Sequence, residues 1–320
     1  MLAVVAGLKS TNIFEKISKT IIGLFHTRRA VICSLIFGTF FFDMIVANDM
    51  SLITFLPLTY IVLHSTKNDK YLAITFILQT IAANMGGMIT PYGNPQNLYL
   101  YSYYNIPTIE FISILLIQSL VVAILLIICC SFIPNEQLSL RKGRKLKVDK
   151  KKLYIYAFLF VLVILSIFRV ISYIITLVAV LLTIFIIDKN IFKKVDYALI
   201  ATFFVFFIFS GNMARIPVIK EFISEIVVKN TLLAGIISCQ FISNVPTAIF
   251  LSKFTAEYKE LLISVNIGSL GILISSLASL ITLKEFLKHQ RKNLRKYIIM
   301  FTAINTAFLV ILLITTKIFN

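Results

Sequence analysis

The sequence predicts an all-α polytopic membrane protein, and three observations lead to that prediction. Of the 320 residues, 59% are hydrophobic and only 14% are charged, against about 25% charged residues in a typical soluble domain. The mean hydropathy is +0.93, and the hydrophobic residues form blocks of about 15 to 25 residues, the length of a bilayer-spanning helix. The four cysteines and three histidines follow no disulfide or metal-site spacing. A secreted disulfide scaffold and a disordered chain are therefore excluded.

The net charge of +17 is concentrated between the hydrophobic blocks. Two basic loops, residues 141–152 and 284–296, hold the largest clusters of lysine and arginine. Because short basic loops stay on the cytoplasmic side of a membrane, we place both there. This topology accounts for the high positive charge, which therefore does not indicate nucleic-acid binding. We expect the lipid bilayer as a partner and no nucleic acid. Seven of the 31 basic residues fall on the opposite side: Arg169, Arg215, Lys220, Lys229, Lys253, Lys259 and Lys317.

The first half begins with a short apolar stub at residues 2–8. Residues 10–25 carry apolar side chains at helical spacing, which is typical of an interfacial helix. Two apolar arms, residues 30–47 and 51–64, are separated by Asn48 and Asp49, and we predict a re-entrant hairpin. Residues 71–101 form a long block broken between Asn84 and Asn97, and residues 111–133 form an uninterrupted span.

The second half repeats this order after the basic loop. Residues 153–168 and 170–187 predict two spans that turn near Arg169, and residues 197–213 predict a third. The remaining segments are an amphipathic helix at 216–229, a hairpin at 231–252 broken at 243–247, a span at 261–283 broken at 266–271, and a last span at 297–316.

The two halves also have similar local sequences: VANDMSLITFLPL beside FISNVPTAIFLSKF, and AANMGGMITP beside SVNIGSLGIL. Interrupted hydrophobic segments at corresponding places in two halves are typical of a secondary transporter whose site lies between repeats. With both basic loops in the cytoplasm, the first hairpin opens inward and the second outward. We therefore predict a first repeat over residues 1–133, a cytoplasmic linker over 134–152 and an inverted second repeat over 153–320, each with a re-entrant hairpin and a broken transmembrane helix.

The repeats are unequal at their beginnings. About three spans precede the amphipathic helix of the second half, whereas only residues 2–8 precede that of the first. Equal repeats would need roughly 50 further residues before Met1. We expect either a misplaced start or a truncated copy.

Broken helices free backbone groups that attract ions, and asparagine recurs at each break. Freed N–H groups attract anions and freed carbonyls attract cations, and amides can serve either ion. We predict substrate contacts from Asn48, Asn94, Asn97, Ser243, Asn244, Thr247, Ser275 and Ser276. We predict a site for the coupling ion, Na+ or H+, from Asp49, Asn84, Gly86, Thr90, Asn244, Asn266 and Gly268. No resident metal or other cofactor is expected.

Two acidic residues, Asp43 and Asp49, are predicted at membrane depth, where a carboxylate is a functional candidate. Asp49 at the hairpin tip can bind Na+, carry a proton or cap the second arm, and these interpretations stay open. Asp43 is interpreted as a local polar contact within the first arm.

These motifs resemble the ion transporter superfamily, which includes divalent anion/sodium symporters, citrate transporters and arsenite permeases. Gly93-Asn-Pro-Gln-Asn97 after Asn84-Met-Gly-Gly is similar to the bacterial anion-permease and arsenite-permease branch. In the symporters each hairpin tip carries Ser-Asn-Thr, which binds sodium and substrate. The matching positions here read Ala47-Asn48-Asp49 and Ser243-Asn244-Val245, so the asparagines match and the threonines do not. The resemblance implies an elevator movement, a homodimer and a bacterial-type plasma (inner) membrane.

The leading hypothesis is a secondary active transporter of a small anion, such as a di- or tricarboxylate or an inorganic oxyanion, coupled to Na+ or H+. An arsenite efflux permease falls in the same class. The alternative is a sodium/proton antiporter that uses Asp49. An intramembrane enzyme would need a His-Glu-x-x-His motif, a serine/lysine pair or facing aspartates, and none is visible, so we do not expect an enzyme.

Overall fold

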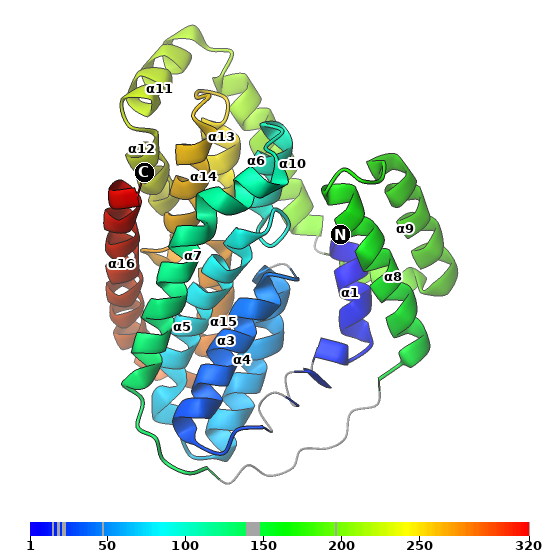
Figure 1. Ribbon diagram of the computed structural model, residues 1–320, viewed down its shortest axis with the longest axis vertical. Coiled ribbons are helices and arrows are strands. Elements are labelled where there is room, and N and C mark those ends of the chain that lie inside the picture. The colour runs from blue at the N-terminus through cyan, green and yellow to red at the C-terminus, as the bar shows by residue number, and fades with distance from the viewer. Residues whose placement is uncertain are drawn as a thin grey trace. The chain divides into compact units, whose positions relative to one another are not determined.

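The computed structural model describes residues 1–14, 16–17, 20, 24–46, 48–138, 148–195 and 197–319 (Figure 1). Every regular element in these ranges is a helix, apart from one isolated bridge between Thr27 and Gln137. The predicted all-α class is confirmed. Ile21 of the expected interfacial helix, the hairpin-tip residue Ala47 and the basic residues 141–147 lie outside the described residues.

Several helical stretches are long and apolar enough to cross a bilayer. Within the described ranges three of them pass on length and composition: Asp69–Ile89, Thr108–Ser131 and Leu277–Phe319. A fourth candidate is the bent pair Ile200–Met213 and Pro217–Lys229, whose segments meet at 101°. Several apolar helices in one chain make this a multi-pass membrane protein.

The chain folds into two compact units, and the first contains Met1–Leu24 and Arg141–Thr202. Its helices are α1 (Leu2–Ser10), α8 (Lys150–Ile167), α9 (Tyr173–Ile187) and the short 3₁₀ helix η3 (Lys189–Lys194). The predicted apolar stub is thus α1, which packs so tightly on α8 that a Cβ at Gly7 would collide with the Tyr156 ring. The expected turn between α8 and α9 occurs at Arg169, which has a positive φ of 63°.

The second unit contains Phe25–Leu140 and Phe203–Asn320. From the first half come α3 (Arg28–Asp43), α4 (Asn48–Ser65), η1 (Asp69–Tyr71), α5 (Leu72–Gly86), η2 (Gly87–Ile89), α6 (Pro95–Tyr103) and α7 (Thr108–Ser131). The second half contributes most of α10 (Tyr197–Met213), then α11 (Pro217–Lys229), α12 (Thr231–Ile242), α13 (Asn244–Leu251), α14 (Tyr258–Ile267), η4 (Leu273–Ser275), α15 (Leu277–Gln290), η5 (Arg291–Asn293) and α16 (Leu294–Phe319). Each unit therefore draws on both halves of the sequence, and the division into two inverted repeats stays a prediction.

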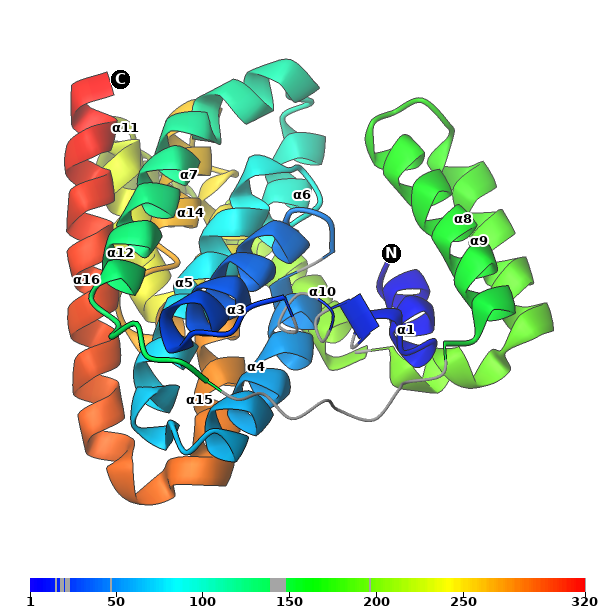
Figure 2. The same cartoon turned by 60° about the horizontal axis from the view of Figure 1, so that its bottom comes forward.

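Helix α5 is central to the second unit, where it packs against α3, α4, α7, α15 and α16 (Figures 1 and 2). Gln79 in the middle of α5 is fully buried. Its Nε2 donates to Thr39 Oγ1 at 3.0 Å, and its Oε1 accepts from Thr59 Oγ1 at 3.0 Å. A buried amide without partners would cost about 1–3 kcal/mol, so these bonds fix α5 against both arms of the first hairpin.

The two helix breaks begin or end at other residues than predicted. Asn84 and Asn266 lie in the last turns of α5 and α14, so the helices continue past the predicted start of each break. The second break runs from residue 268 to residue 276 instead of ending at Gly271. Ser275 therefore ends the short 3₁₀ helix η4 within the break, and Ser276 is the residue directly before α15.

Candidate transport site

All the predicted site residues fall in the second unit. Most are buried, and Asp49, Thr90 and Ser243 are half-buried. The fold therefore places both hairpin tips and both helix breaks in one compact body, although they are far apart in the sequence.

The first break is tied to the tip of the first hairpin. Helix α5 ends at Gly86, and α6 starts with Pro95 at its first position, where a missing N–H costs nothing. Between them, Thr90 Oγ1 donates to the Met44 carbonyl at 3.2 Å. The backbone N–H of Asn48 donates to the Gly93 carbonyl at 3.2 Å. The hairpin and the loop of the break thus support each other.

Two asparagine amides satisfy backbone carbonyls freed where α5 ends. Asn94 Nδ2 donates to the Asn84 carbonyl at 2.9 Å, and Asn97 Nδ2 donates to the Met88 carbonyl at 3.1 Å. Such carbonyls have no partner within their own helix. The two side chains predicted to contact substrate therefore also stabilise the broken helix.

The tip of the second hairpin holds a strained residue. Ser243 between α12 and α13 has φ +70° and ψ 159°, a region occupied almost only by glycine and found at functional sites. Its carbonyl accepts from Thr247 Oγ1 at 2.8 Å, and its hydroxyl lies 3.4 Å from the Ser275 carbonyl. Asn244 Oδ1 accepts the Val245 N–H at 3.0 Å. The tip therefore contacts the second break through Ser275.

Gln240 was not predicted as a site residue, yet it organises the second break. Its Nε2 donates to the carbonyls of Gly268 and Leu270 at 2.9 and 3.0 Å, and its Oε1 accepts the Ile272 N–H at 3.1 Å. Gly271, with φ +115°, provides the turn that brings these groups to one side chain. The available signal was a long polar residue in a largely apolar arm, four residues before Asn244.

The two breaks meet through hydrogen bonds that run in both directions between the halves. Asn84 Nδ2 donates to Ser276 Oγ at 3.0 Å, and Asn266 Nδ2 donates to Asn97 Oδ1 at 2.7 Å. In each case the donor is the asparagine in the last turn before its own break. The breaks therefore line a shared polar region between the halves.

Each hairpin also packs on its broken helix in the same register. A Cβ at Gly86 would collide with the backbone of Phe40, which stands eight residues before Asn48. A Cβ at Gly268 would lie 3.0 Å from the Cα of Ile236, eight residues before Asn244. This matched register supports the hypothesis of two repeats.

The two intramembrane carboxylates are placed differently. Asp49 is half-buried in the first turn of α4. Asp43, the last residue of α3, is fully buried, and its carboxylate lies against Gly87, whose backbone N–H donates a hydrogen bond to it. Its polar contact is therefore with the first break, and not within the first arm as expected.

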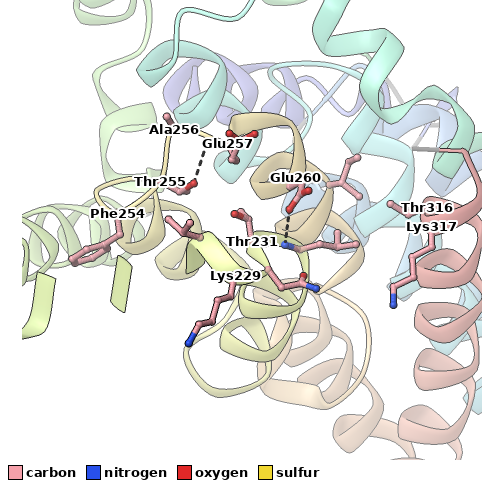
Figure 3. A pocket seen from close by; sticks show the side chains of 13 residues that line it. Lys229, Thr231, Phe254, Thr255, Ala256, Glu257, Glu260, Thr316 and Lys317 are labelled. Carbon is pink, nitrogen blue, oxygen red and sulfur yellow. Dashed lines mark hydrogen bonds between the residues drawn. The ribbon is translucent and has the colours of Figure 1, made fainter. Parts of the chain in front are cut away.

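A cavity of about 680 Å³ lies apart from these residues (Figure 3). Its charged lining mixes Lys229 and Lys317 with Glu257 and Glu260, and Glu260 accepts the Leu232 N–H at 3.2 Å. None of the predicted site residues lines it. Because its charges balance, the cavity has no evident preference for an anion, and we do not place the substrate there.

Comparison with known proteins decides the family. The model of the citrate transporter family matches residues 1–264. The chain belongs to the citrate transporter family. It is 32% identical over 323 residues to an uncharacterized transporter of Methanocaldococcus jannaschii, covering all of this chain and 87% of that protein. It is 24% identical over 283 residues to the inner membrane protein YbiR of Escherichia coli, covering 87% of this chain and 75% of that protein.

The resemblance to anion permeases is thereby confirmed. Family membership implies a membrane transporter of citrate-like anions. The apolar helices and the transporter relative agree with a multi-pass transport protein.

Proposed function

We propose that the protein is a secondary active transporter that moves a small anion, such as a di- or tricarboxylate or an inorganic oxyanion, with Na+ or H+ as the coupling ion. The observation that carries this proposal is the hydrogen bonding between the halves: Asn84 reaches Ser276, and Asn266 reaches Asn97. A site built from both halves is typical of transporters that work by alternating access.

The anion is bound by dipoles and amides. Helices α4 and α13 begin at the hairpin tips, with Asn48 and Asn244 as their first residues. A helix N-terminus offers unpaired N–H groups and a partial positive charge to an anion. No lysine or arginine occurs within either break or tip, so the site releases its anion without leaving a buried cation behind. The predicted contacts from Asn94, Asn97, Ser243, Thr247, Ser275 and Ser276 belong to this proposal.

Movement is proposed to be of the elevator type. The second unit contains both hairpins and both broken helices, whereas α8 and α9 belong to the first. We propose that the hairpins and broken helices carry the bound anion relative to a scaffold formed by the outer spans. The basic segment 284–296 is helical and not a loop, since it contains the end of α15, η5 and the start of α16. We place it and the basic segment 141–152 on the cytoplasmic face of a bacterial-type inner membrane, and we propose a homodimer.

Uptake by proteoliposomes tests the function. The panel contains labelled succinate, citrate, phosphate, arsenite and sulfate, under imposed Na+ or pH gradients. We expect uptake of one anion, driven by one gradient, abolished by Asn244→Ala and retained in the exposed control Asn293→Ala.

Other results would redirect or overturn the proposal. Sodium-driven proton movement without anion uptake would establish the antiporter alternative based on Asp49. Arsenite as the only transported species would establish an arsenite permease. Uptake that survives Asn244→Ala would remove the second hairpin tip from the site.

A further inference from the structure

The cavity of about 680 Å³ shown in Figure 3 lies where four helices begin or end. Its lining residues all belong to the second unit. Helix α11 ends beside it at Lys229, α16 contributes Lys317 from its last turn, and α12 and α14 start there. Because apolar membrane helices end near the bilayer surface, we place the cavity at the depth of the lipid headgroups. Its volume is within the range of about 300–1,000 Å³ that small-molecule pockets have.

The charged side chains of this cavity are separated by sign. Figure 3 shows Glu257 and Glu260 along its upper edge, and the side chains of Lys229 and Lys317 below them. Neither Glu257 nor Lys317 forms an ion pair within the described residues. Lys229 pairs with Glu225 of its own helix at 2.7 Å, and both side chains are exposed. Such an exposed pair is weak, so the Lys229 ammonium can exchange it for a ligand.

A ligand with charge of one sign does not fit this arrangement. The glutamates repel an anion and the lysines repel a cation, whereas a molecule with both an anionic and a cationic group satisfies the two sides. Lysine ammonium groups donate hydrogen bonds to a phosphate, and carboxylates accept them from a primary ammonium. A quaternary ammonium is recognised instead by a cage of aromatic rings, and among the described residues of the lining Phe254 is the only aromatic one. The cavity therefore favours a phosphate joined to a primary ammonium.

Apolar side chains next to the cavity are open to the bilayer. Val228 precedes Lys229, and Ile318 and Phe319 follow Lys317. Val228, Ile318 and Phe319 are 72%, 70% and 61% exposed. Exposed apolar surface beside a polar cavity marks a membrane contact, because acyl chains cover such side chains and a free headgroup does not. These surroundings favour a lipid over a soluble zwitterion.

We infer that this cavity binds the headgroup of a zwitterionic phospholipid with a primary ammonium, of which phosphatidylethanolamine is the simplest. Lys229 and Lys317 bind its phosphate. Glu257 and Glu260 bind its ammonium, and Glu260 Oε2 also accepts the Leu232 N–H at 3.2 Å. The lipid thereby links the end of α16 to the start of α12, the first arm of the second hairpin. This site is additional to the proposed transport site and does not depend on the proposed function.

Thermal unfolding of the purified full chain in a nonionic detergent tests the lipid site without relying on transport. The protein is washed free of bound lipid, and short-chain phosphatidylethanolamine, phosphatidylcholine and phosphatidylglycerol are titrated separately. A lipid that binds only the folded state raises the melting temperature in a saturable way. We expect this rise with phosphatidylethanolamine, and an apparent affinity at least tenfold weaker for the other two. The choline group has no N–H to donate, and phosphatidylglycerol has no ammonium.

Two variants remove one charge from each side of the cavity. Lys317→Gln and Glu257→Gln change exposed side chains, so both proteins should fold, and each should weaken the affinity for phosphatidylethanolamine at least tenfold. Glu257→Gln should also bind phosphatidylglycerol more tightly than the wild type does, because the variant no longer repels an anionic lipid at that position. The matched controls are Lys220→Gln and Glu221→Gln, which change exposed residues of α11 outside the cavity. Both controls should bind as the wild type does.

Four results would overturn the lipid site. The first is a wild-type melting temperature that does not respond to phosphatidylethanolamine. The second is equal affinity for phosphatidylglycerol, which would reduce the effect to attraction between lysines and an anionic lipid. The third is equal affinity for phosphatidylcholine, which would show that no carboxylate binds the ammonium. The fourth is unchanged affinity in Lys317→Gln or Glu257→Gln, which would place the lipid elsewhere on the protein.

Free phosphoethanolamine distinguishes a lipid from a soluble ligand, since it carries both charged groups and no acyl chains. We expect its apparent affinity to be at least tenfold weaker than that of the lipid. Equal stabilisation by the free headgroup would overturn the lipid assignment. Anion uptake and lipid binding are separate measurements, so the lipid site and the proposed function can each fail without the other.

Discussion

Replacing Gly86 with alanine tests the packing of the first hairpin on the broken helix. Gly86 has helical dihedrals, φ −65° and ψ −51°, and in an open helix alanine is about 1 kcal/mol more favourable than glycine. Here the new methyl would collide with the Phe40 carbonyl oxygen and lie 3.0 Å from the carbonyl carbon and Cα of Phe40. These are backbone atoms, so α3 itself must move by roughly 0.5–1 Å to restore normal carbon contacts. Overpacking of this kind costs about 1–3 kcal/mol.

Gly211 in α10 provides the matched control, because nothing lies within 4 Å of a Cβ built there. Gly211→Ala should stabilise the protein, and Gly86→Ala should be about 1–3 kcal/mol less stable than this control. The chain has no tryptophan, so we would follow unfolding with a thiol-reactive dye that reports exposure of the buried Cys130 and Cys239. Each kcal/mol corresponds to a shift on the order of 2–4 °C. A Gly86→Ala protein that melts at or above Gly211→Ala would refute the close packing of the hairpin.

Three further predictions concern other contacts. A double-mutant cycle on Asn97 and Asn266, measured by thermal unfolding, should give a coupling energy of about 0.5–1.5 kcal/mol through their 2.7 Å hydrogen bond. If the stability changes of the two single variants simply add, a direct bond between the halves is contradicted. Ser243→Gly should raise the melting temperature, because it relieves about 1 kcal/mol or more of backbone strain. The substitution loses only hydroxyl contacts of 3.3 and 3.4 Å. A lower melting temperature would contradict the strain at this residue. The Arg28 guanidinium lowers the pKa of the Glu136 carboxyl, so their pairing stabilises the protein above the usual glutamate pKa and is lost as pH falls through the lowered one. Glu136→Gln should therefore flatten the dependence of melting temperature on pH as pH falls below the ordinary glutamate pKa of about 4.3. An unchanged slope would show that the pair contributes nothing.

The sequence predicted the helical class and the four interruptions because apolar block length and clusters of Asn, Gly and Pro are local signals. The end of the second break carried no such signal. Residues 272–274 are Ile-Leu-Ile, which pattern alone assigns to a helix. The structure keeps them out of α15 partly through Gln240, whose bonds to the break come from a separate helix.

The environment of Asp43 also lay beyond the local pattern. Its neighbours Phe41, Phe42 and Met44 are apolar, so the local pattern predicts a membrane helix and gives no sign of the residues around the carboxylate. Only the tertiary fold brings Gly87 and Asn94 to its carboxylate. The same limit applies to the contact of Asn84 with Ser276, which joins residues 192 positions apart.

Equilibrium anion binding tests most directly whether one substrate site is formed by both halves. The transported anion would be titrated into purified wild type, Asn48→Ala, Asn244→Ala and the exposed control Asn293→Ala. Because each hairpin tip starts a helix directed at the anion, we predict that both tip variants weaken binding at least tenfold, about 1.4 kcal/mol, and that the control binds as the wild type does. Unchanged affinity in either tip variant would contradict a site shared between the two halves.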